Sequence, residues 1–291
     1  MLKVSIAPDG KEYPLPDAKE AEKEREILKQ ITAEQIALGR KIVAVQGLGF
    51  VGCVMATVVA DATDEDGKPI YFVHGHQRAS QRSYWKVPVI NSGIPPVNSS
   101  DPEVPKIFHR TVIEKKNFRA TSEESVYGLV DIVVVDIQLD ATKPAFGDAE
   151  QGYCDITAFR EGIRTLGKYI QPECLVLVET TVPPGTCEKV VKPILEEEFT
   201  KRGIDIEKKP PLIAHSYERV MPGAHYVASI RDFWRVFSGV NSKSIELCRE
   251  FLSHILDVKN YPLTQLDSTN ASELAKTMEN SYRAVNIAFT L

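Results

Sequence analysis

The sequence predicts an α/β protein whose core is a doubly wound, mostly parallel sheet with helices on both faces. Short runs rich in β-branched residues alternate with helical patterns, which is the arrangement that parallel sheets require. A glycine-rich turn also joins the first of these runs to a helical segment. The runs that we expect to be strands are residues 41–45, 70–73, 132–137, 175–178, 211–214 and 234–237.

The composition excludes several classes of protein. The chain has 291 residues, enough for about two domains at roughly 150 residues each. Its net charge of −5 lacks the basic excess typical of nucleic-acid-binding proteins, and no apolar run approaches the roughly 18 residues of a membrane span. The N-terminus lacks the apolar core of a secretion signal, so we expect a cytoplasmic protein. The five scattered cysteines include no CxxC pair and indicate neither a disulfide framework nor a metal site.

Residues 1–40 are expected to form an N-terminal extension ahead of a main domain that covers residues 41–265. Residues 1–16 contain prolines and a glycine and show no periodicity. Residues 17–40 are dense in Glu, Lys and Ala with apolar residues interspersed, which predicts an amphipathic helix packed on the main domain or on a partner. In the main domain, residues 91–101 are polar and contain proline, which predicts a long surface loop.

Residues 266–291 predict the beginning of a long C-terminal connecting helix. Asn270 is a candidate N-cap, Glu273 follows three positions later, and apolar residues then recur at helical spacing. The helical pattern is still running at Leu291, so we expect the natural chain to continue beyond it.

The strongest motif is the sequence GLGFVG at residues 47–52, between a predicted strand and a predicted helix. This context indicates a Rossmann-type dinucleotide-binding turn, although a tight turn needed only for packing is the alternative. Gly47 permits the turn, Gly49 lets the backbone approach a pyrophosphate, and Gly52 allows close packing of helix and strand. The helix N-terminus then faces the anion with free N–H groups. The predicted cofactor-binding residues of the turn are Gly47, Leu48, Gly49, Phe50, Val51 and Gly52.

The end of the second predicted strand bears on the choice of cofactor. About twenty residues after the glycine turn, an NAD site usually has Asp or Glu to bind the ribose hydroxyls. Gln77 and Arg78 occupy this region instead. Gln77 can bond a hydroxyl, and Arg78 can stack on adenine or bind a 2′-phosphate, so NADP stays open beside NAD. His74 and His76 alternate along the strand without a third ligand, which disfavours a metal site.

Candidate catalytic side chains lie at two later strand ends and on the last helix. Thr181 follows residues 175–178 and Glu218 follows residues 211–214, so both are expected at the edge where parallel sheets bind ligands. A hydroxyl-rich turn and a surface ion pair are the respective alternatives. Lys276 and Asn280 are four residues apart and can together stabilise a developing oxyanion. Exposed helix polarity is the alternative for them.

Four motifs in order closely resemble the UDP-glucose/GDP-mannose 6-dehydrogenase family. They are VQGLGFVG at residues 45–52, ETTVPPGT at 179–186, SYERVMPG at 216–223 and ELAKTMENSYRAVNIA at 273–288. The resemblance implies an enzyme of polysaccharide biosynthesis that oxidises the C6 alcohol of a nucleotide sugar, such as a UDP-sugar, to a uronic acid. The oxidation implied is two hydride transfers to NAD, through an aldehyde and a cysteine-bound thioester. The resemblance also implies a homodimer contact through the last helix.

The same resemblance implies roles for four residues. Thr181 would help to hold substrate or water beside the cofactor, and Glu218 is suited to general-base work in thioester hydrolysis. Lys276 and Asn280 would position the oxyanion and water.

The sequence also departs from the family pattern. Tyr217 stands where the family often has proline, Gln77 lies near the usual ribose-binding aspartate, and residues 136–140 (DIQLD) replace a small-residue and proline turn. The family's nucleophilic cysteine lies in a glycine-rich motif of a second domain beyond the long helix, and no cysteine here has such a context. Cys187 is better interpreted as a small buried side chain. We therefore expect this chain alone to bind cofactor with little turnover, and its last helix to expose an apolar face that makes it oligomeric.

Two other functions stay open at this point. A hydroxyacid dehydrogenase would use Lys276 and Asn280 around a single hydride transfer and would need no cysteine. The other is a non-catalytic dinucleotide-binding module that assembles with another chain, which would need neither the catalytic residues nor a cysteine.

Overall fold

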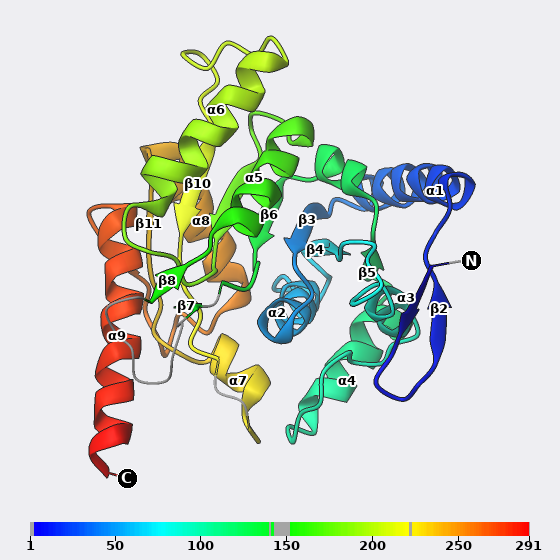
Figure 1. Ribbon diagram of the computed structural model, residues 1–291, viewed down its shortest axis with the longest axis horizontal. Coiled ribbons are helices and arrows are strands. Elements are labelled where there is room, and N and C mark those ends of the chain that lie inside the picture. Colours follow the sequence, from blue (N-terminus) through cyan, green and yellow to red (C-terminus); the bar gives the residue numbers. More distant parts are fainter. Residues whose placement is uncertain (1–2, 140, 143–151, 221–222, 291) are drawn as a thin grey trace.

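The computed structural model describes residues 3–139, 141–142, 152–220 and 223–290. Its centre is an eight-stranded sheet with the strand order β12-β11-β10-β9-β6-β3-β4-β5 (Figure 1). Neighbouring strands of this sheet are parallel except β10 and β11, which are antiparallel. The strands are β3 (Lys41–Gln46), β4 (Tyr71–His76), β5 (Phe118–Thr121), β6 (Ile132–Val135), β9 (Leu175–Val178), β10 (Leu212–His215), β11 (Val236–Gly239) and β12 (Thr264–Gln265).

Helices cover both faces of this sheet, which confirms the predicted doubly wound architecture (Figure 1). Side chains of a strand point alternately to the two faces. In β3, Val43 and Val45 pack on one side while Ile42 and Ala44 pack on the other. A strand buried on both faces needs a continuous apolar run, which these four residues provide. The first face carries α2 (Phe50–Asp61), α4 (Glu103–His109), α7 (Tyr226–Arg231) and α8 (Ser242–Ile255), and the second carries α1 (Ala18–Ala37), α5 (Thr157–Tyr169) and α6 (Lys192–Lys201).

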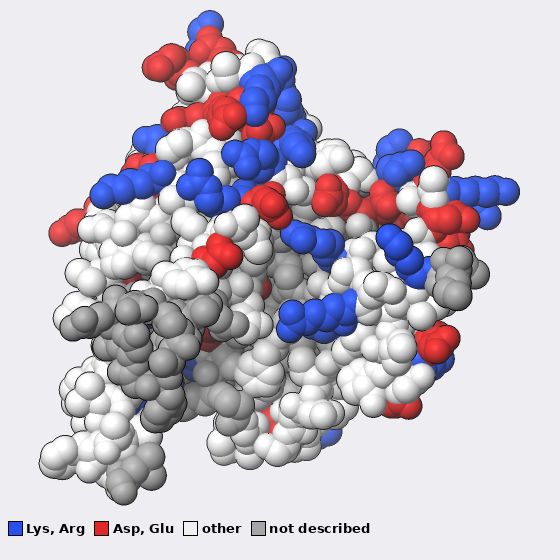
Figure 2. All heavy atoms as spheres, in the orientation of Figure 1, with Lys and Arg blue, Asp and Glu red and all other residues white. Residues whose placement is uncertain are grey.

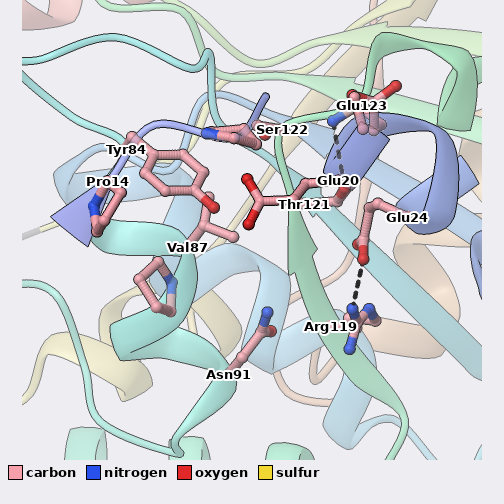
Figure 3. A pocket seen from close by; sticks show the side chains of 13 residues that line it. Pro14, Glu20, Glu24, Tyr84, Val87, Asn91, Arg119, Thr121, Ser122 and Glu123 are labelled. Carbon is pink, nitrogen blue, oxygen red and sulfur yellow. Dashed lines mark hydrogen bonds and ion pairs between the residues drawn. The ribbon is translucent and has the colours of Figure 1, made fainter. Parts of the chain in front are cut away.

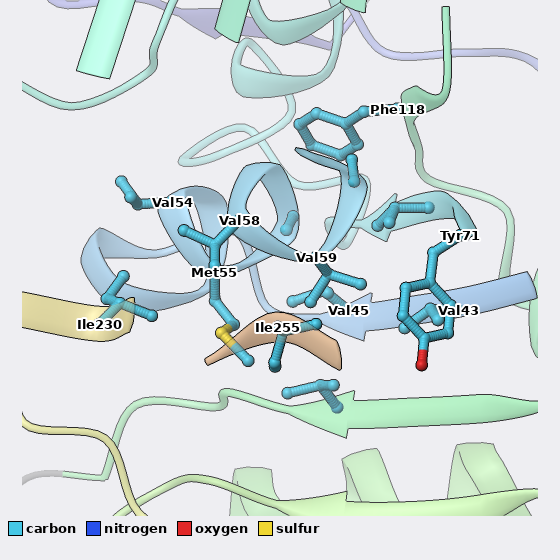
Figure 4. Packing of buried hydrophobic residues seen from close by; sticks show 14 of the residues in the cluster. Val43, Val45, Val54, Met55, Val58, Val59, Tyr71, Phe118, Ile230 and Ile255 are labelled. Atoms are coloured by element: carbon cyan, nitrogen blue, oxygen red, sulfur yellow. The ribbon is translucent and has the colours of Figure 1, made fainter. Parts of the chain in front are cut away.

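Helix α2 is almost wholly buried, with every residue from 52 to 60 inside the protein. In Figure 4, Val54, Met55 and Val58 of this helix lie beside Ile230 of α7 and Ile255 of α8. Because α2 begins within the glycine turn, at Phe50, this packing fixes the position of its N-terminus relative to β3.

The N-terminal extension forms a hairpin followed by the predicted helix. Strands β1 (Val4–Ile6) and β2 (Glu12–Pro14) pair antiparallel, a hairpin that the sequence pattern did not predict. Asp17 is the N-cap of α1: its side chain accepts from the backbone N–H of Glu20, whose carboxylate accepts from the backbone N–H of Asp17. Leu28 of α1 is buried in the core on the second face of the sheet. The helix therefore packs on the main domain, as predicted.

A pocket of about 320 Å³ lies between this extension and the main domain (Figure 3). Glu24 of α1 crosses it to pair with Arg119 of β5 at 2.8 Å. On the hairpin, the Ser5 hydroxyl accepts the backbone N–H of Trp85 at 3.1 Å. Trp85 directly precedes α3 (Lys86–Asn91), so the extension holds the chain segment between β4 and α3.

Each predicted run overlaps an observed strand, and the run at residues 175–178 matches β9. The prediction missed β5 and β12, and also β7 (Ala141–Thr142) with β8 (Tyr153–Cys154), which pair with each other. The predicted loop at residues 91–101 follows α3 and precedes α4. Its last residue, Asp101, is buried, and its carboxylate accepts the backbone N–H of Val227 of α7 at 2.9 Å.

Helix α9 (Thr269–Thr290) begins one residue before the predicted N-cap, Asn270. The Ser268 hydroxyl accepts the backbone N–H of Ala271 at 3.2 Å and caps the helix instead. One face of the first turns is buried, whereas apolar side chains further along are exposed, with Tyr282 at 74% and Phe289 at 91%. Leu291 lies outside the described residues.

Over the described part of the chain, no helix is both long enough and apolar enough to cross a membrane.

Candidate active site

The glycine turn joins β3 to α2 as predicted, and its glycines differ in what surrounds them. Gly47 has a φ of +101°, and a Cβ there would lie 2.6 Å from the Asp136 carbonyl oxygen. A Cβ on Gly52 would lie 2.0 Å from the Gly47 carbonyl oxygen. At Gly49, by contrast, an added Cβ would meet no described atom of the surrounding structure within 4 Å. Packing therefore requires Gly47 and Gly52, while Gly49 leaves open space at the turn.

This open space suits the pyrophosphate of a dinucleotide cofactor. Gly49 is the N-cap of α2, and no described side chain caps that end of the helix. The first N–H groups of a helix have no partner within it, and the helix dipole adds positive charge there. Phe50 closes one side, because its ring stacks on Tyr226 at 4.6 Å and its carbonyl accepts the Tyr226 hydroxyl. Leu48 is buried in the hydrophobic core, whereas Val51 is half-buried.

Gln77 follows β4, where an NAD site usually has a carboxylate. Its Oε1 accepts the backbone N–H of Leu48 at 3.1 Å, and its Nε2 donates to the Ser83 hydroxyl at 3.0 Å. Gln77 therefore joins the glycine turn to the segment after β4 and carries no charge of its own. Arg78 is largely exposed, and Glu161 of α5 lies 4.0 Å from its Nη2.

Lys276 of α9 meets Glu218 beside the carboxyl end of β10. Lys276 is only 7% exposed, and its Nζ donates to the Glu218 carbonyl at 2.6 Å. Burial lowers the pKa of Lys276, while the charges of Glu218 and Glu279 act in the opposite direction. The Nζ also lies 5.0 Å from the centre of the Tyr217 ring, and the Tyr217 hydroxyl donates to Glu279 at 3.0 Å. Tyr217, one of the departures noted above, thus helps to fix this cation.

Thr181 and Asn280 are the other predicted catalytic residues. Thr180 donates its hydroxyl to the carbonyls of Val135 and Ile137, at 3.1 and 3.0 Å, and half-buried Thr181 follows it. The Glu218 carboxylate accepts the backbone N–H of Val220. Asn280 is exposed, one helical turn beyond Lys276.

Within the described residues, Glu218 and Lys276 are in contact, whereas no hydrogen bond joins Thr181 or Asn280 to either of them. Met221 and Pro222 of the predicted motif at residues 216–223 lie outside the described residues.

Glu273 does not complete a capping box with Asn270, contrary to the prediction. Its Oε2 accepts the backbone N–H groups of Gly185 and Thr186, and its Oε1 accepts that of Cys187 at 2.7 Å. These N–H groups begin η3 (Cys187–Val191), the turn that leads into α6, and would otherwise lack helical partners. Glu273 is fully buried, so satisfying these buried donors takes precedence over a local cap. The bonds lock α9 to the turn after β9.

A buried ion pair that the sequence analysis missed lies next to these residues. Arg235 Nη1 is 2.8 Å from Glu179 Oε1, and both side chains are completely buried. Glu179 follows β9 and Arg235 precedes β11, so the pair bridges separate strands at this edge of the sheet. The two residues are 56 positions apart, and the only sequence signal was a charged residue at each strand end.

Asp136 is a second feature that the sequence analysis left without a role. It follows β6, and its carboxyl Oδ2 has no hydrogen-bond partner among the described residues. Burial raises the pKa of Asp136 well above its usual value, and the charges of Glu179 and Glu218 raise it further. A raised pKa favours the protonated, neutral form of Asp136, and that form does not repel an anion at the adjoining glycine turn. Asp140, from the same predicted segment, lies outside the described residues.

Cys187 is fully buried, as predicted. Burial raises the pKa of its thiol well above the usual value, and the neighbouring Glu273 carboxylate acts in the same direction. A thiol without thiolate character is a poor nucleophile, so Cys187 is a packing residue.

Comparison with known proteins identifies the family. Residues 41–255 match the sequence model of the UDP-glucose/GDP-mannose dehydrogenase family, NAD binding domain. A UDP-N-acetyl-D-mannosamine dehydrogenase of Pyrococcus horikoshii is 26% identical over 84% of this chain and 51% of its own length. An NDP-N-acetyl-D-galactosaminuronic acid dehydrogenase of Ralstonia nicotianae is 25% identical over 86% of this chain and 52% of its own. The chain thus spans about half the length of the curated relatives it matches.

A solved structure agrees with this assignment. The NDP-N-acetyl-D-galactosaminuronic acid dehydrogenase of Methanosarcina mazei Go1 superposes with a TM-score of 0.73 at 32% identity. The match covers 90% of this chain and 51% of that one. Sheet, helices and glycine turn are therefore those of a nucleotide-sugar dehydrogenase cofactor domain.

Proposed function

Because this chain belongs to the UDP-glucose/GDP-mannose dehydrogenase family and contains its NAD-binding domain, we propose that it takes part in nucleotide-sugar 6-oxidation. In this proposal, residues 41–265 hold NAD, residues 266–291 begin the helix through which two copies associate, and residues 1–40 are an added extension. The substrate is the C6 alcohol of a UDP-sugar or related nucleotide sugar, which is oxidised to the uronic acid.

The observation that carries the proposal is the contact between Lys276 and Glu218 at the carboxyl end of β10. The glycine turn, which follows β3, lies at the same edge of the sheet. Parallel α/β sheets bind ligands at this edge. When bound there, NAD accepts the hydride. The chain's own residues must place the sugar and manage charge and protons around it.

Lys276 is suited to stabilising an oxyanion on the substrate. It is a buried cation whose pKa is lowered by burial, so it can hold a developing negative charge in surroundings that screen it little. Thr181, half-buried just after β9, can donate its hydroxyl to substrate or water, and Asn280 can donate its side-chain amide N–H from the next turn of α9. Glu218 has a carboxylate positioned to accept a proton from water. Glu273 and the Glu179–Arg235 pair hold these elements in place.

The test begins with NAD binding to the purified chain, measured by calorimetry. Residues 41–291 are then fused in place of the aligned half of the Pyrococcus horikoshii relative, and NADH formation is followed with UDP-N-acetyl-D-mannosamine and UDP-glucose. We expect two NADH per sugar oxidised by the fusion, and cofactor binding with little turnover by the chain alone.

Matched variants of the fusion separate the roles. Glu218→Gln and Lys276→Met are expected to lower kcat by about a hundredfold or more, with NAD affinity unchanged. Glu246→Gln, at an exposed position of α8, should leave both unchanged. One NADH per substrate would instead support a hydroxyacid dehydrogenase. NAD binding without oxidation by a folded fusion would support a non-catalytic binding module.

A further inference from the structure

Asp136 carries a carboxyl group that the proposed reaction does not use. It follows β6 and begins the segment DIQLD, one of the departures noted above. The residue is half-buried, so part of it is accessible to a ligand. Its Oδ2, however, is buried and has no hydrogen-bond partner among the described residues. Buried polar atoms in proteins normally have a partner, so this carboxyl group needs an explanation.

Asp136 lies directly against the glycine turn. Its backbone N–H donates to the Gln46 carbonyl at 2.9 Å. An added Cβ on Gly47 would lie 2.6 Å from the Asp136 carbonyl oxygen, and one on Gly52 would lie 3.0 Å from the Asp136 Cβ. The carboxyl group therefore belongs to the same end of the sheet as the turn that holds the cofactor in the proposed function.

The strand order indicates which half of a dinucleotide Asp136 meets. From β3 the chain continues to β4 and β5 on one side, and then to β6, β9 and β10 on the other. A dinucleotide crosses the sheet edge where the order reverses, with its adenosine ribose at the end of the second strand of the fold, which here is β4. Its nicotinamide half then faces β6 and β9. Figure 2 shows a hollow near the centre of the view, over the region where Figure 1 shows the carboxyl ends of β3 and β6.

Asp136 adjoins a group of charged residues at these strand ends. Val135 of β6 pairs with Val178 of β9, so the residues that follow them, Asp136 and Glu179, are neighbours. Glu179 pairs in turn with Arg235 at 2.8 Å, and both of these side chains are completely buried. Burial raises the pKa of Asp136 well above its usual value, the Glu179 charge acts in the same direction, and Arg235 acts against both.

The charges of this group balance when one carboxyl group keeps its proton. The acids that act on one another are Asp136, Glu179 and Glu218, and the cations among them are Arg235 and Lys276. With Asp136 protonated, two carboxylates face two cations. A further positive charge placed beside the group would stabilise the ionised form of Asp136, whereas a neutral group would not.

Two other titratable groups face Asp136 from the helices, and both stay protonated. They are the Cys53 thiol of α2 and the Tyr226 hydroxyl of α7. Burial raises the pKa of Cys53 to about 12 and also raises that of Tyr226, and Asp136 contributes to both increases. Neither group therefore exchanges a proton near neutral pH.

We propose that Asp136 makes this domain sensitive to the redox state of its cofactor, because it releases its proton when NAD⁺ binds and keeps it when NADH binds. The inference rests on the dinucleotide binding of the proposed function. The nicotinamide ring is positively charged in NAD⁺ and neutral in NADH, while both forms carry the same pyrophosphate. Since a proton leaves the carboxyl group as NAD⁺ binds, the affinity for NAD⁺ rises with pH, whereas that for NADH does not.

Calorimetry on the 291-residue chain counts these protons without any turnover. NAD⁺ and NADH are each titrated at neutral pH in phosphate and in Tris. These buffers differ in their enthalpy of ionisation, so the difference in measured heat gives the number of protons released. We expect roughly half a proton or more per NAD⁺ and close to none per NADH. From about pH 6 to about pH 8, the Kd of NAD⁺ should fall about tenfold relative to that of NADH.

Variants locate the proton. Asp136→Asn keeps the shape of the side chain without its proton, and Asp136→Ala removes the carboxyl group altogether. Both are expected to release no proton on binding NAD⁺, while their affinity for NADH stays within about twofold, because the Asp136 side chain is neutral in that complex. The matched control is Asp267→Asn, at an exposed position before α9, which should change neither proton count. Urea unfolding verifies that each variant is folded.

The outcomes separate the two proposals. Equal proton counts for NAD⁺ and NADH, with both still bound, overturn the redox sensing by Asp136 and leave the cofactor domain standing. A release that persists in folded Asp136→Asn but disappears in Lys276→Met assigns the proton to the lysine and also overturns it. Failure of both dinucleotides to bind the folded chain overturns both proposals.

Discussion

The carboxylate of Glu273 accepts the backbone N–H of Cys187 at 2.7 Å and so joins the first turn of α9 to the turn that follows β9. The same carboxylate also accepts the N–H groups of Gly185 and Thr186. Lys276 lies one turn further along α9 and contacts Glu218. The position of the candidate catalytic lysine therefore depends on a carboxylate that itself contacts no reacting group.

Replacing Glu273 tests this dependence. Glu273→Gln places an amide N–H group among three backbone donors, so we expect a loss of about 2–3 kcal/mol in the free energy of unfolding. Urea denaturation measures it, with exposed Glu246→Gln on α8 as the matched control, expected to stay within about 0.5 kcal/mol. A Glu273 variant as stable as the control would show that α9 is held in place by other contacts.

Gly49 and Gly52 should respond oppositely to the same added methyl group. Gly49→Ala meets open space at a φ of −77°, so stability should stay within about 0.5 kcal/mol, while NAD affinity falls at least about tenfold because the methyl group occupies the pyrophosphate approach. Gly52→Ala would place a Cβ 2.0 Å from the Gly47 carbonyl and should cost about 2 kcal/mol or more of stability. Unfolding and calorimetric titration of both variants give the result. Undiminished NAD binding by Gly49→Ala would place the cofactor elsewhere.

Asp136 should make stability depend on pH. Its pKa is raised in the folded state by burial and by nearby Glu179 and Glu218. The folded protein therefore holds a proton that the unfolded chain releases near pH 4, and stability falls as pH rises from there toward the folded pKa. Asp136→Asn removes this cost, so it should be more stable than the unmodified chain at pH 8 by about 1 kcal/mol or more, with the advantage shrinking toward pH 5.

Urea unfolding across this pH range measures the effect, with Asp267→Asn, an exposed aspartate, as the control. A constant difference between Asp136→Asn and the unmodified chain at every pH would show that Asp136 ionises normally in the folded protein.

The exposed apolar face of α9 should drive association of the chain. Leu274, Met278, Tyr282, Val285 and Phe289 recur at helical spacing and are 43–91% exposed. We expect concentration-dependent dimers in sedimentation velocity, because burying this stripe removes apolar surface from water. The double variant Met278→Glu with Val285→Glu should be monomeric, whereas Lys243→Glu on α8 should not change the association. A monomer at high concentration for the unmodified chain would contradict the proposed helix-mediated dimer.

The overall fold followed from local patterns that act over a few residues. Each long β-branched run became a strand because a strand buried on both faces needs such a run, and the GLGFVG turn fixed where the first strand met its helix. The short strands β5 and β12 were missed, since Phe118–Thr121 and Thr264–Gln265 hold few apolar residues and are strands only by pairing with β4 and β11. The hairpin of β1 and β2 was missed because residues 1–16 show no periodicity.

The sequence by itself determined the fold class, the glycine turn, the family resemblance and the identity of the candidate catalytic residues. Only the tertiary structure decided which of them meet. It placed Lys276 on the Glu218 carbonyl, left Asn280 exposed, turned Glu273 toward residues 185–187, and paired Glu179 with Arg235. These arrangements join residues far apart in the chain and arise because buried donors and charges must find partners wherever packing brings them. Local periodicity carries no information about such contacts.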